Sequence, residues 1–299
     1  MTRGKTITLF LMDGNAQGRR KATLSNWTGV AYLIPRTDLA ISRDREDLKK
    51  SGVYLLFGRD DEDVEKVYIG QARERKDSSG ILQRISEHVG ERNLDYWTSA
   101  VAFVTSSNSF GPTEISYLEN QFVNMALVAK RYVVTNGNEP SPGTVTEEKQ
   151  AELDEFIDNA RLVIGALGFP VFEPIDEAKA SPNDVDTVEL QMSYRSTTAK
   201  GRQTNDGFVL LAGAQLCPDD QFNNSCPDSV RKRRQEFRHS IDANFVTTDD
   251  LLFNSPSGAA EFVGGSSLSG PEYWKDASGK SLKQLEQERI NQIENLMGA

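Results

Sequence analysis

The sequence contains no apolar run of the length that a membrane helix needs. Such a helix takes about 20 consecutive apolar residues, and the apolar stretch nearest the start covers only residues 7–12. It is followed at once by the turn residues Asp13 and Gly14, not by a small-residue cleavage site, so it does not fit a secretion signal. We therefore expect a cytoplasmic protein with no membrane partner.

Cysteine is nearly absent. The 299 residues include two cysteines, Cys217 and Cys226, which are too few for a disulfide framework. Two reduced thiols are a more ordinary interpretation than a bridge or half of a metal site. The fold must therefore rest on a hydrophobic core, for which the 37% hydrophobic content is sufficient.

Basic charge is also in short supply, and this bears on nucleic-acid binding. The net charge is −10, whereas phosphate binding depends on Lys and Arg residues that displace counterions. The charge is uneven along the chain: residues 1–50 carry +5, 51–140 carry −4, 141–185 carry −7 and 186–299 carry −4. This distribution is compatible with a weak or selective nucleic-acid binder and does not favour a tight, nonspecific one.

Two short glycine and tyrosine motifs stand in the second segment. Gly52-Val53-Tyr54 and Tyr68-Ile69-Gly70 each lie in an apolar run with strand character, and a polar, charged stretch at 58–66 separates them. A strand, a turn and a second strand predict a hairpin. Such a hairpin would bring the two tyrosines close together on one small sheet.

Two helical segments and one strand complete a β-β-α-β-α pattern. The first helix, predicted at 80–92, carries Arg84 and His88, which are four residues apart and so share a face. After the third strand, a helix at 113–130 carries an apolar stripe at helical spacing. Glu119 lies next to this stripe, so its carboxylate should emerge at the edge of the buried face.

Taken in order, this set of two tyrosines, an arginine, a histidine and a glutamate resembles the GIY-YIG endonuclease superfamily. The resemblance covers residues 52 to about 136, which is under a third of the chain. It implies a small mixed or antiparallel three-stranded sheet flanked by helices, and a metal-dependent endonuclease that hydrolyses phosphodiester bonds in DNA. It also implies one metal ion, Mg²⁺ or Mn²⁺, held by Glu119, and a catalytic base at the first tyrosine, assisted by a second tyrosine or a histidine.

The residue types suit that chemistry on their own terms. Mg²⁺ keeps several waters, so one carboxylate such as Glu119 can hold it while it neutralises phosphate charge. The guanidinium of Arg84 pairs with two phosphate oxygens in a fixed geometry, and His88 takes or relays a proton near neutral pH. Tyr54 and Tyr68 can orient the attacking water. Because a free phenol has a pKa of about 10, either tyrosine needs a nearby cation to act as a base.

One further site residue is ambiguous. Asn136 resembles a late family asparagine that steadies the site, and Asn138 is a rival for the same position. The chain also departs from the family pattern. Val53 replaces isoleucine, the hairpin turn carries four consecutive acidic residues at 60–63, and a polar excursion covers 74–79. An acidic loop beside a DNA-binding face would repel phosphate, which affects duplex affinity more than catalysis.

The remaining segments frame this core. We expect an N-terminal β element with a lead-in helix in 1–50, the nuclease-like domain in 51–140, an acidic helix and linker in 141–185, and a small α+β module in 186–299, which makes an α+β (α/β) chain. The strings at 253–260 and 273–282 resemble a small domain without assigned activity that is appended to such nucleases in bacterial proteins. The basic run at 231–234 could grip nucleic acid or be a solvated helix face.

Two other functions stay open at this level. The acidic balance also suits a non-catalytic nucleic-acid-binding module that uses a degenerate nuclease fold. A regulatory protein that recruits a protein partner through its C-terminal module is the other alternative. RNA stays open as a substrate alongside DNA, and the sequence does not specify the substrate structure, the pathway or the oligomeric state.

Overall fold

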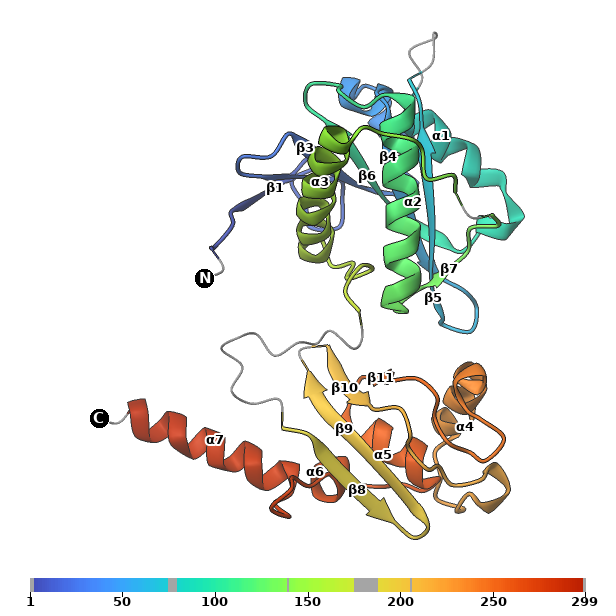
Figure 1. Cartoon of the computed structure of the whole chain (residues 1–299), viewed down its shortest axis with the longest axis vertical. Helices are drawn as coiled ribbons and strands as arrows, with labels where there is room; N and C mark the ends of the chain where they lie inside the picture. Colours follow the sequence, from blue (N-terminus) through green and yellow to red (C-terminus); the bar gives the residue numbers. More distant parts are fainter. Residues whose placement is uncertain (1–2, 75–79, 139, 175–187, 205, 298–299) are drawn as a thin grey trace. The chain divides into compact units, whose positions relative to one another are not determined.

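The computed structural model describes residues 3–74, 80–138, 140–174, 188–204 and 206–297, with side chains to residue 291 (Figure 1). The chain forms two compact units, Met1–Pro174 and Ile175–Ala299. Both combine helices with a sheet, so the α+β class is confirmed. Of the polar excursion at 74–79 only Glu74 is described, and the part of the expected linker segment from residue 175 to 185 lies outside the described residues. No helix in the described ranges is both long and apolar enough to cross a membrane.

The first unit is built on one mixed sheet of seven strands, where a three-stranded sheet was predicted for the nuclease-like core and a β element before it. The motif hairpin lies between β6 and the short β7, and β6 pairs on its other side with β3. The predicted N-terminal β element is therefore continuous with the sheet of the core, because the largely apolar and buried β6 has hydrogen-bonded neighbours on both edges. In the order β1-β2-β3-β6-β4-β5-β7, the strands are Ile7–Leu11, Arg20–Leu24, Gly29–Pro35, Trp97–Thr105, Gly52–Arg59, Glu65–Ala72 and Val133–Val134.

Helices cover both faces of this sheet. Alternate side chains of β4 point to opposite faces, as the pleat requires. Val53 and Leu55 pack in one buried cluster with residues of α2 (Pro112–Ala129) and α3 (Glu147–Ala166). Tyr54 and Leu56 pack in another with residues of α1 (Ile81–Glu87). The two motif tyrosines therefore face α1, whereas Glu119 belongs to a helix on the opposite face.

The lead-in helix predicted before the first motif is replaced by three short 3-10 turns at Arg36–Asp38, Ala40–Ser42 and Glu46–Lys49. The backbone of Arg45 is extended, with φ −86° and ψ 108°, and this interrupts any continuous helix. The region offers too few apolar side chains for a helical stripe, since only Leu39 and Leu48 are buried hydrophobics there.

The second unit has a four-stranded antiparallel sheet, ordered β11-β10-β9-β8, with helices packed against it. Trp274 is fully buried in its core and donates a hydrogen bond of 2.9 Å from its indole nitrogen to Pro256 O. This position suits core packing and leaves no ring face for base stacking. The strands are β8 Leu190–Tyr194, β9 Thr197–Thr204, β10 Gly207–Leu210 and β11 Leu251–Phe253, and the helices are α4 Asp228–Glu236, α5 Pro256–Gly264, α6 Gly270–Tyr273 and α7 Leu282–Met297.

Two sequence features of the second unit are explained by burial. Arg234, in the basic run, is 3% exposed and donates to the carbonyl oxygens of Phe262 and Cys217 at 2.6 and 3.1 Å. It is therefore a structural cation, not a free phosphate ligand. Cys217 and Cys226 are both free thiols, as expected.

Candidate active site

The glycine of the second motif makes room for the tyrosine of the first. Tyr54 on β4 lies opposite Gly70 on β5 in the antiparallel register. A β-carbon at position 70 would lie 2.4 Å from the Tyr54 hydroxyl oxygen, so only glycine allows the phenol to rest there. Tyr68, two residues earlier on β5, points to the same face, and the ring centroids of the two tyrosines are 6.3 Å apart.

His88 joins this pair from the end of α1. Its Nε2 lies 2.7 Å from the Tyr54 hydroxyl, and its ring centroid lies 5.0 Å from that of Tyr68. The imidazole is 1% exposed and Tyr54 is fully buried, so of these three rings only that of Tyr68 is partly exposed. On its other side, Nδ1 lies 3.0 Å from Glu91 Oε1, although the contact is too far off line to count as a hydrogen bond.

Arg84 supplies the positive charge of the site. It lies one helical turn before His88 and forms an ion pair of 2.8 Å with Glu87 through Nη1. Burial raises the pKa of both Tyr54 and Tyr68 above the usual value for a phenol, and Arg84 opposes that rise through its charge and hydrogen bonding. The guanidinium is thus the group that stabilises negative charge at the paired hydroxyls.

Glu119 reaches the site from the opposite face, at the β5 edge of the sheet. Gln71, which follows the motif glycine, donates from Nε2 to Glu119 Oε2 at 2.9 Å. The carboxylate is half-buried, and burial raises its pKa, while hydrogen bonds from Gln71 and the charge of Arg84 lower it. Its charge in turn raises the pKa of Tyr54 and Tyr68, so carboxylate, guanidinium and both phenols interact electrostatically.

Asn136 acts on the backbone of β5. Its side-chain amide donates to Ile69 O at 2.7 Å and accepts from Ile69 N at 3.1 Å. The Asn136 side chain therefore makes the two hydrogen bonds that a neighbouring strand would make to Ile69, and it fixes the backbone of β5 next to Tyr68. Asn138 is exposed and lies beyond this contact.

Two residues of this arrangement were not predicted from the sequence. Gln71 positions the Glu119 carboxylate, and Glu91 contacts the buried imidazole. Each had a signal in the sequence, because Gln71 is adjacent to a motif glycine and Glu91 stands three residues after His88, one turn further along the chain.

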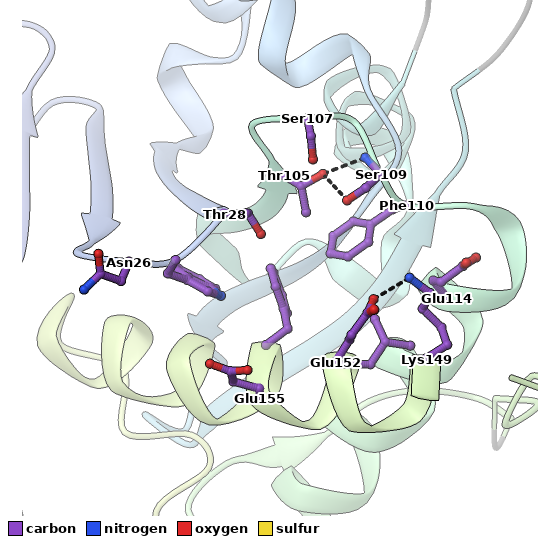
Figure 2. Close-up of a pocket in the computed structure, with 13 residues that line it drawn as sticks. Asn26, Thr28, Thr105, Ser107, Ser109, Phe110, Glu114, Lys149, Glu152 and Glu155 are labelled. Atoms are coloured by element: carbon purple, nitrogen blue, oxygen red, sulfur yellow. Dashed lines mark hydrogen bonds and ion pairs between the residues drawn. The ribbon is translucent and has the colours of Figure 1, made fainter. Parts of the chain in front are cut away.

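A separate hollow of about 370 Å³ lies on the α3 side of the first unit (Figure 2). It contains none of the six predicted site residues, and its charged rim includes the ion pair of Lys149 with Glu152. We place the candidate chemistry at the tyrosine pair, because a coupled proton donor and acceptor are found there. The hollow is lined by Asn26, Trp27, Thr28, Thr105, Ser107, Ser109, Phe110, Glu114, Lys149, Glu152, Leu153, Glu155 and Phe156.

The comparison with known proteins gives a match in the second unit alone. Residues 190–286 match the family model of a domain of unknown function, DUF4357. Both C-terminal strings singled out in the sequence lie inside this match. No curated protein and no solved structure matches the chain.

Proposed function

We propose that the protein is a metal-dependent endonuclease of GIY-YIG type that hydrolyses phosphodiester bonds in DNA. The observation that carries the proposal is the contact of 2.7 Å between the Tyr54 hydroxyl and His88 Nε2, with Arg84 and Glu119 in electrostatic contact with the same phenol. A buried tyrosine of the core has no need of a buried base and a separate cation.

The chemistry of the donor set fits one Mg²⁺ or Mn²⁺ ion at Glu119. Gln71 donates a hydrogen bond to Oε2, which leaves Oε1 as a ligand oxygen. One carboxylate suffices for a magnesium ion that keeps most of its waters. When bound, the ion supplies Lewis-acid stabilisation of the phosphate charge. Among the described residues, no three His, Cys, Asp or Glu side chains cluster in the way that a larger metal centre would require.

The protein groups around the phenol suit a proton relay. Because burial raises the pKa of Tyr54, its phenolate is scarce near neutral pH. Because Tyr54 is buried, the relay requires that a water enter beside its hydroxyl when the substrate binds. That water can give its proton to Tyr54 Oη while Tyr54 gives its own proton to His88 Nε2. The resulting hydroxide forms the new oxygen–phosphorus bond, the bond from phosphorus to the leaving oxygen breaks, and that oxygen takes a proton from solvent. His88 then returns its proton through the tyrosine.

Arg84 suits the phosphate itself. The ion pair with Glu87 uses Nη1, and guanidinium donors that face the Tyr54 and Tyr68 hydroxyls can pair with the oxygens of a phosphodiester instead. The acidic turn at 60–63 lies in the loop between β4 and β5, and this favours a selective substrate over any duplex. In this proposal the C-terminal module recruits or guides the nuclease, through DNA or through a protein partner. The proposed location of the enzyme is the cytoplasm.

A second candidate is a binding protein that uses the same fold without catalysis. The observation in its favour is the half-buried Glu119 with its hydrogen bond to Gln71, because a carboxylate already bonded within the protein can be purely structural. Under this alternative, DNA or RNA binding would be indifferent to divalent metal and to the charge at position 119.

The test is a nicking assay on branched, nicked and duplex DNA with Mg²⁺ or Mn²⁺, compared with a chelator. Glu119→Gln should abolish cleavage, and Glu114→Gln, on the same helix but at the hollow of Figure 2, is the matched control that should retain it. Equal cleavage by wild type and Glu119→Gln would contradict the proposed function. DNA binding without cleavage in every variant would support the second candidate.

A further inference from the structure

His88 is buried and has a protein group beside each of its two ring nitrogens. Nε2 lies 2.7 Å from the Tyr54 hydroxyl, and Nδ1 lies 3.0 Å from Glu91 Oε1. The ring is 1% exposed, and Nδ1 itself is buried. The protein groups beside the two ring nitrogens therefore decide which nitrogen carries the proton of the neutral ring.

The two partners favour one tautomer. A carboxylate accepts hydrogen bonds and donates none. If Nδ1 carried no proton, its lone pair would face Glu91 Oε1 at 3.0 Å without solvent to separate them. With the proton on Nδ1, the lone pair of Nε2 instead accepts the Tyr54 hydroxyl hydrogen. This is the tautomer that a relay from the tyrosine needs.

The position of Glu91 is fixed by the backbone. His88 begins a 3-10 turn, His88–Gly90, and Glu91 N donates to His88 O at 3.3 Å. The guanidinium of Arg36, the residue that follows β3, donates to Val89 O in this turn at 2.8 Å and to Asp95 O at 2.9 Å. Glu91 is therefore presented to the imidazole by an anchored turn.

We infer that Glu91 is a positioning residue, which holds the proton of His88 on Nδ1 and so leaves Nε2 free to take a proton from Tyr54. The arrangement follows the general logic of a nucleophile or water activator, a base and a group that orients the base. The contact between Glu91 Oε1 and His88 Nδ1 is poorly aligned for a hydrogen bond. We expect it to become shorter and better aligned when His88 takes the proton from Tyr54. The catalytic consequence rests on the proposed function, and the tautomer does not.

An ordinary surface ion pair is the competing interpretation, because the Glu91 side chain is 43% exposed and such pairs contribute little to stability. The two interpretations differ in what they fix. A surface pair leaves the ring free to choose its tautomer, whereas a positioning residue determines it. The measurement must therefore report on the ring, not on stability.

The chain suits such a measurement because it has only two histidines, His88 and His239. Long-range proton–nitrogen NMR on ¹⁵N-histidine-labelled full-length protein identifies which ring nitrogen carries hydrogen, and His239→Gln assigns the signals. We expect the Nδ1–H form at His88 in the wild type. Glu91→Leu should shift the ring toward Nε2–H, while Glu91→Gln, which keeps an acceptor oxygen, should largely preserve Nδ1–H. Asp95→Asn, an exposed carboxylate of the same loop, is the control.

The inference would be overturned if the His88 ring of the wild type carried its proton on Nε2. It would also be overturned if Glu91→Leu kept the Nδ1–H tautomer of the wild type. If the leucine variant does not fold, the comparison of Glu91→Gln with Asp95→Asn replaces it. Loss of the Nδ1–H form in Glu91→Gln but not in Asp95→Asn would also contradict the inference, since Glu91→Gln retains the acceptor oxygen. In single-turnover cleavage, Glu91→Leu should lower the rate about 10-fold, as part of a relay worth about 100-fold or more, without weakening DNA binding. A fixed tautomer in a protein that cleaves nothing would uphold the positioning role and refute the proposed function.

Discussion

The hydroxyl of Tyr54 occupies the space that a β-carbon of Gly70 would fill, at a separation of 2.4 Å. Gly70→Ala should therefore push the fully buried phenol away from His88. We expect a loss of about 1–3 kcal/mol in unfolding free energy, as for overpacking of a core, measured by denaturant titration. Gly90→Ala is the matched control, because nothing lies within 4 Å of a β-carbon there. Equal stability of the two variants would contradict the observed packing.

Asn136 should matter to the fold as well as to the site, whereas Asn138 should not. Asn136→Ala removes both hydrogen bonds to Ile69 at the β5 edge, and we expect it to cost about 1–3 kcal/mol. Asn138→Ala changes an exposed side chain and should remain within about 0.5 kcal/mol of the wild type. Thermal unfolding of the two variants distinguishes them, and the reverse order would assign the structural role to Asn138.

Glu119 should destabilise the folded protein as the pH rises. Burial raises its pKa, so the folded state binds the proton more tightly than the unfolded state does. Its contribution to stability is therefore greatest below the ordinary glutamate pKa of 4.5 and declines as the pH rises through the higher folded value. Glu119→Gln keeps an acceptor for Gln71 and removes the charge. We expect the unfolding free energy of the variant, relative to that of the wild type, to increase from acidic to neutral pH in parallel denaturant titrations. A difference in unfolding free energy that stays constant across this range would contradict the direction of the pKa shift.

Arg234 should be required for the fold of the second unit. Arg234→Met leaves the carbonyl oxygens of Phe262 and Cys217 without their buried donor, and we expect a loss of about 2–4 kcal/mol. Lys232→Met, an exposed change in the same basic run, is the control for lost charge. If DNA affinity falls equally in both variants and stability falls in neither, the basic run is a phosphate ligand after all.

The sequence predicted the core of the first unit because hydrophobic period and turn chemistry agree there. The hairpin, the third strand and the helix that carries Glu119 appear at their predicted places. The helix predicted at 80–92 ends at Glu87, so that it carries Arg84 whereas His88 begins a 3-10 turn. The extent of the sheet was not predictable in the same way. The pairing of β3 with β6 joins Ala31 to Phe103, although β4, β5 and α1 lie between these two strands in the sequence. No local pattern specifies such a distant partner.

The candidate site was predictable as a set of residues but not as a network. The motif order identified Tyr54 and His88, but their contact depends on how α1 packs on the sheet. The roles of Gln71 and Glu91 follow from side-chain contacts of 2.9 Å to Glu119 and 3.0 Å to His88, which the motif residues alone do not predict. In the second unit, strands β9 and β11 carry little local signal, because they are polar or very short.

The central claim is that Tyr54 and His88 work as one relay, and a double-mutant cycle tests it most directly. Single-turnover cleavage of DNA in Mg²⁺ would be measured for Tyr54→Phe, His88→Gln and the double variant, with DNA affinity measured in parallel. The account predicts that each single change lowers the rate about 100-fold or more, that affinity is retained, and that the double variant is scarcely slower than either single one. Independent, multiplying losses, or cleavage at the wild-type rate by Tyr54→Phe, would contradict it.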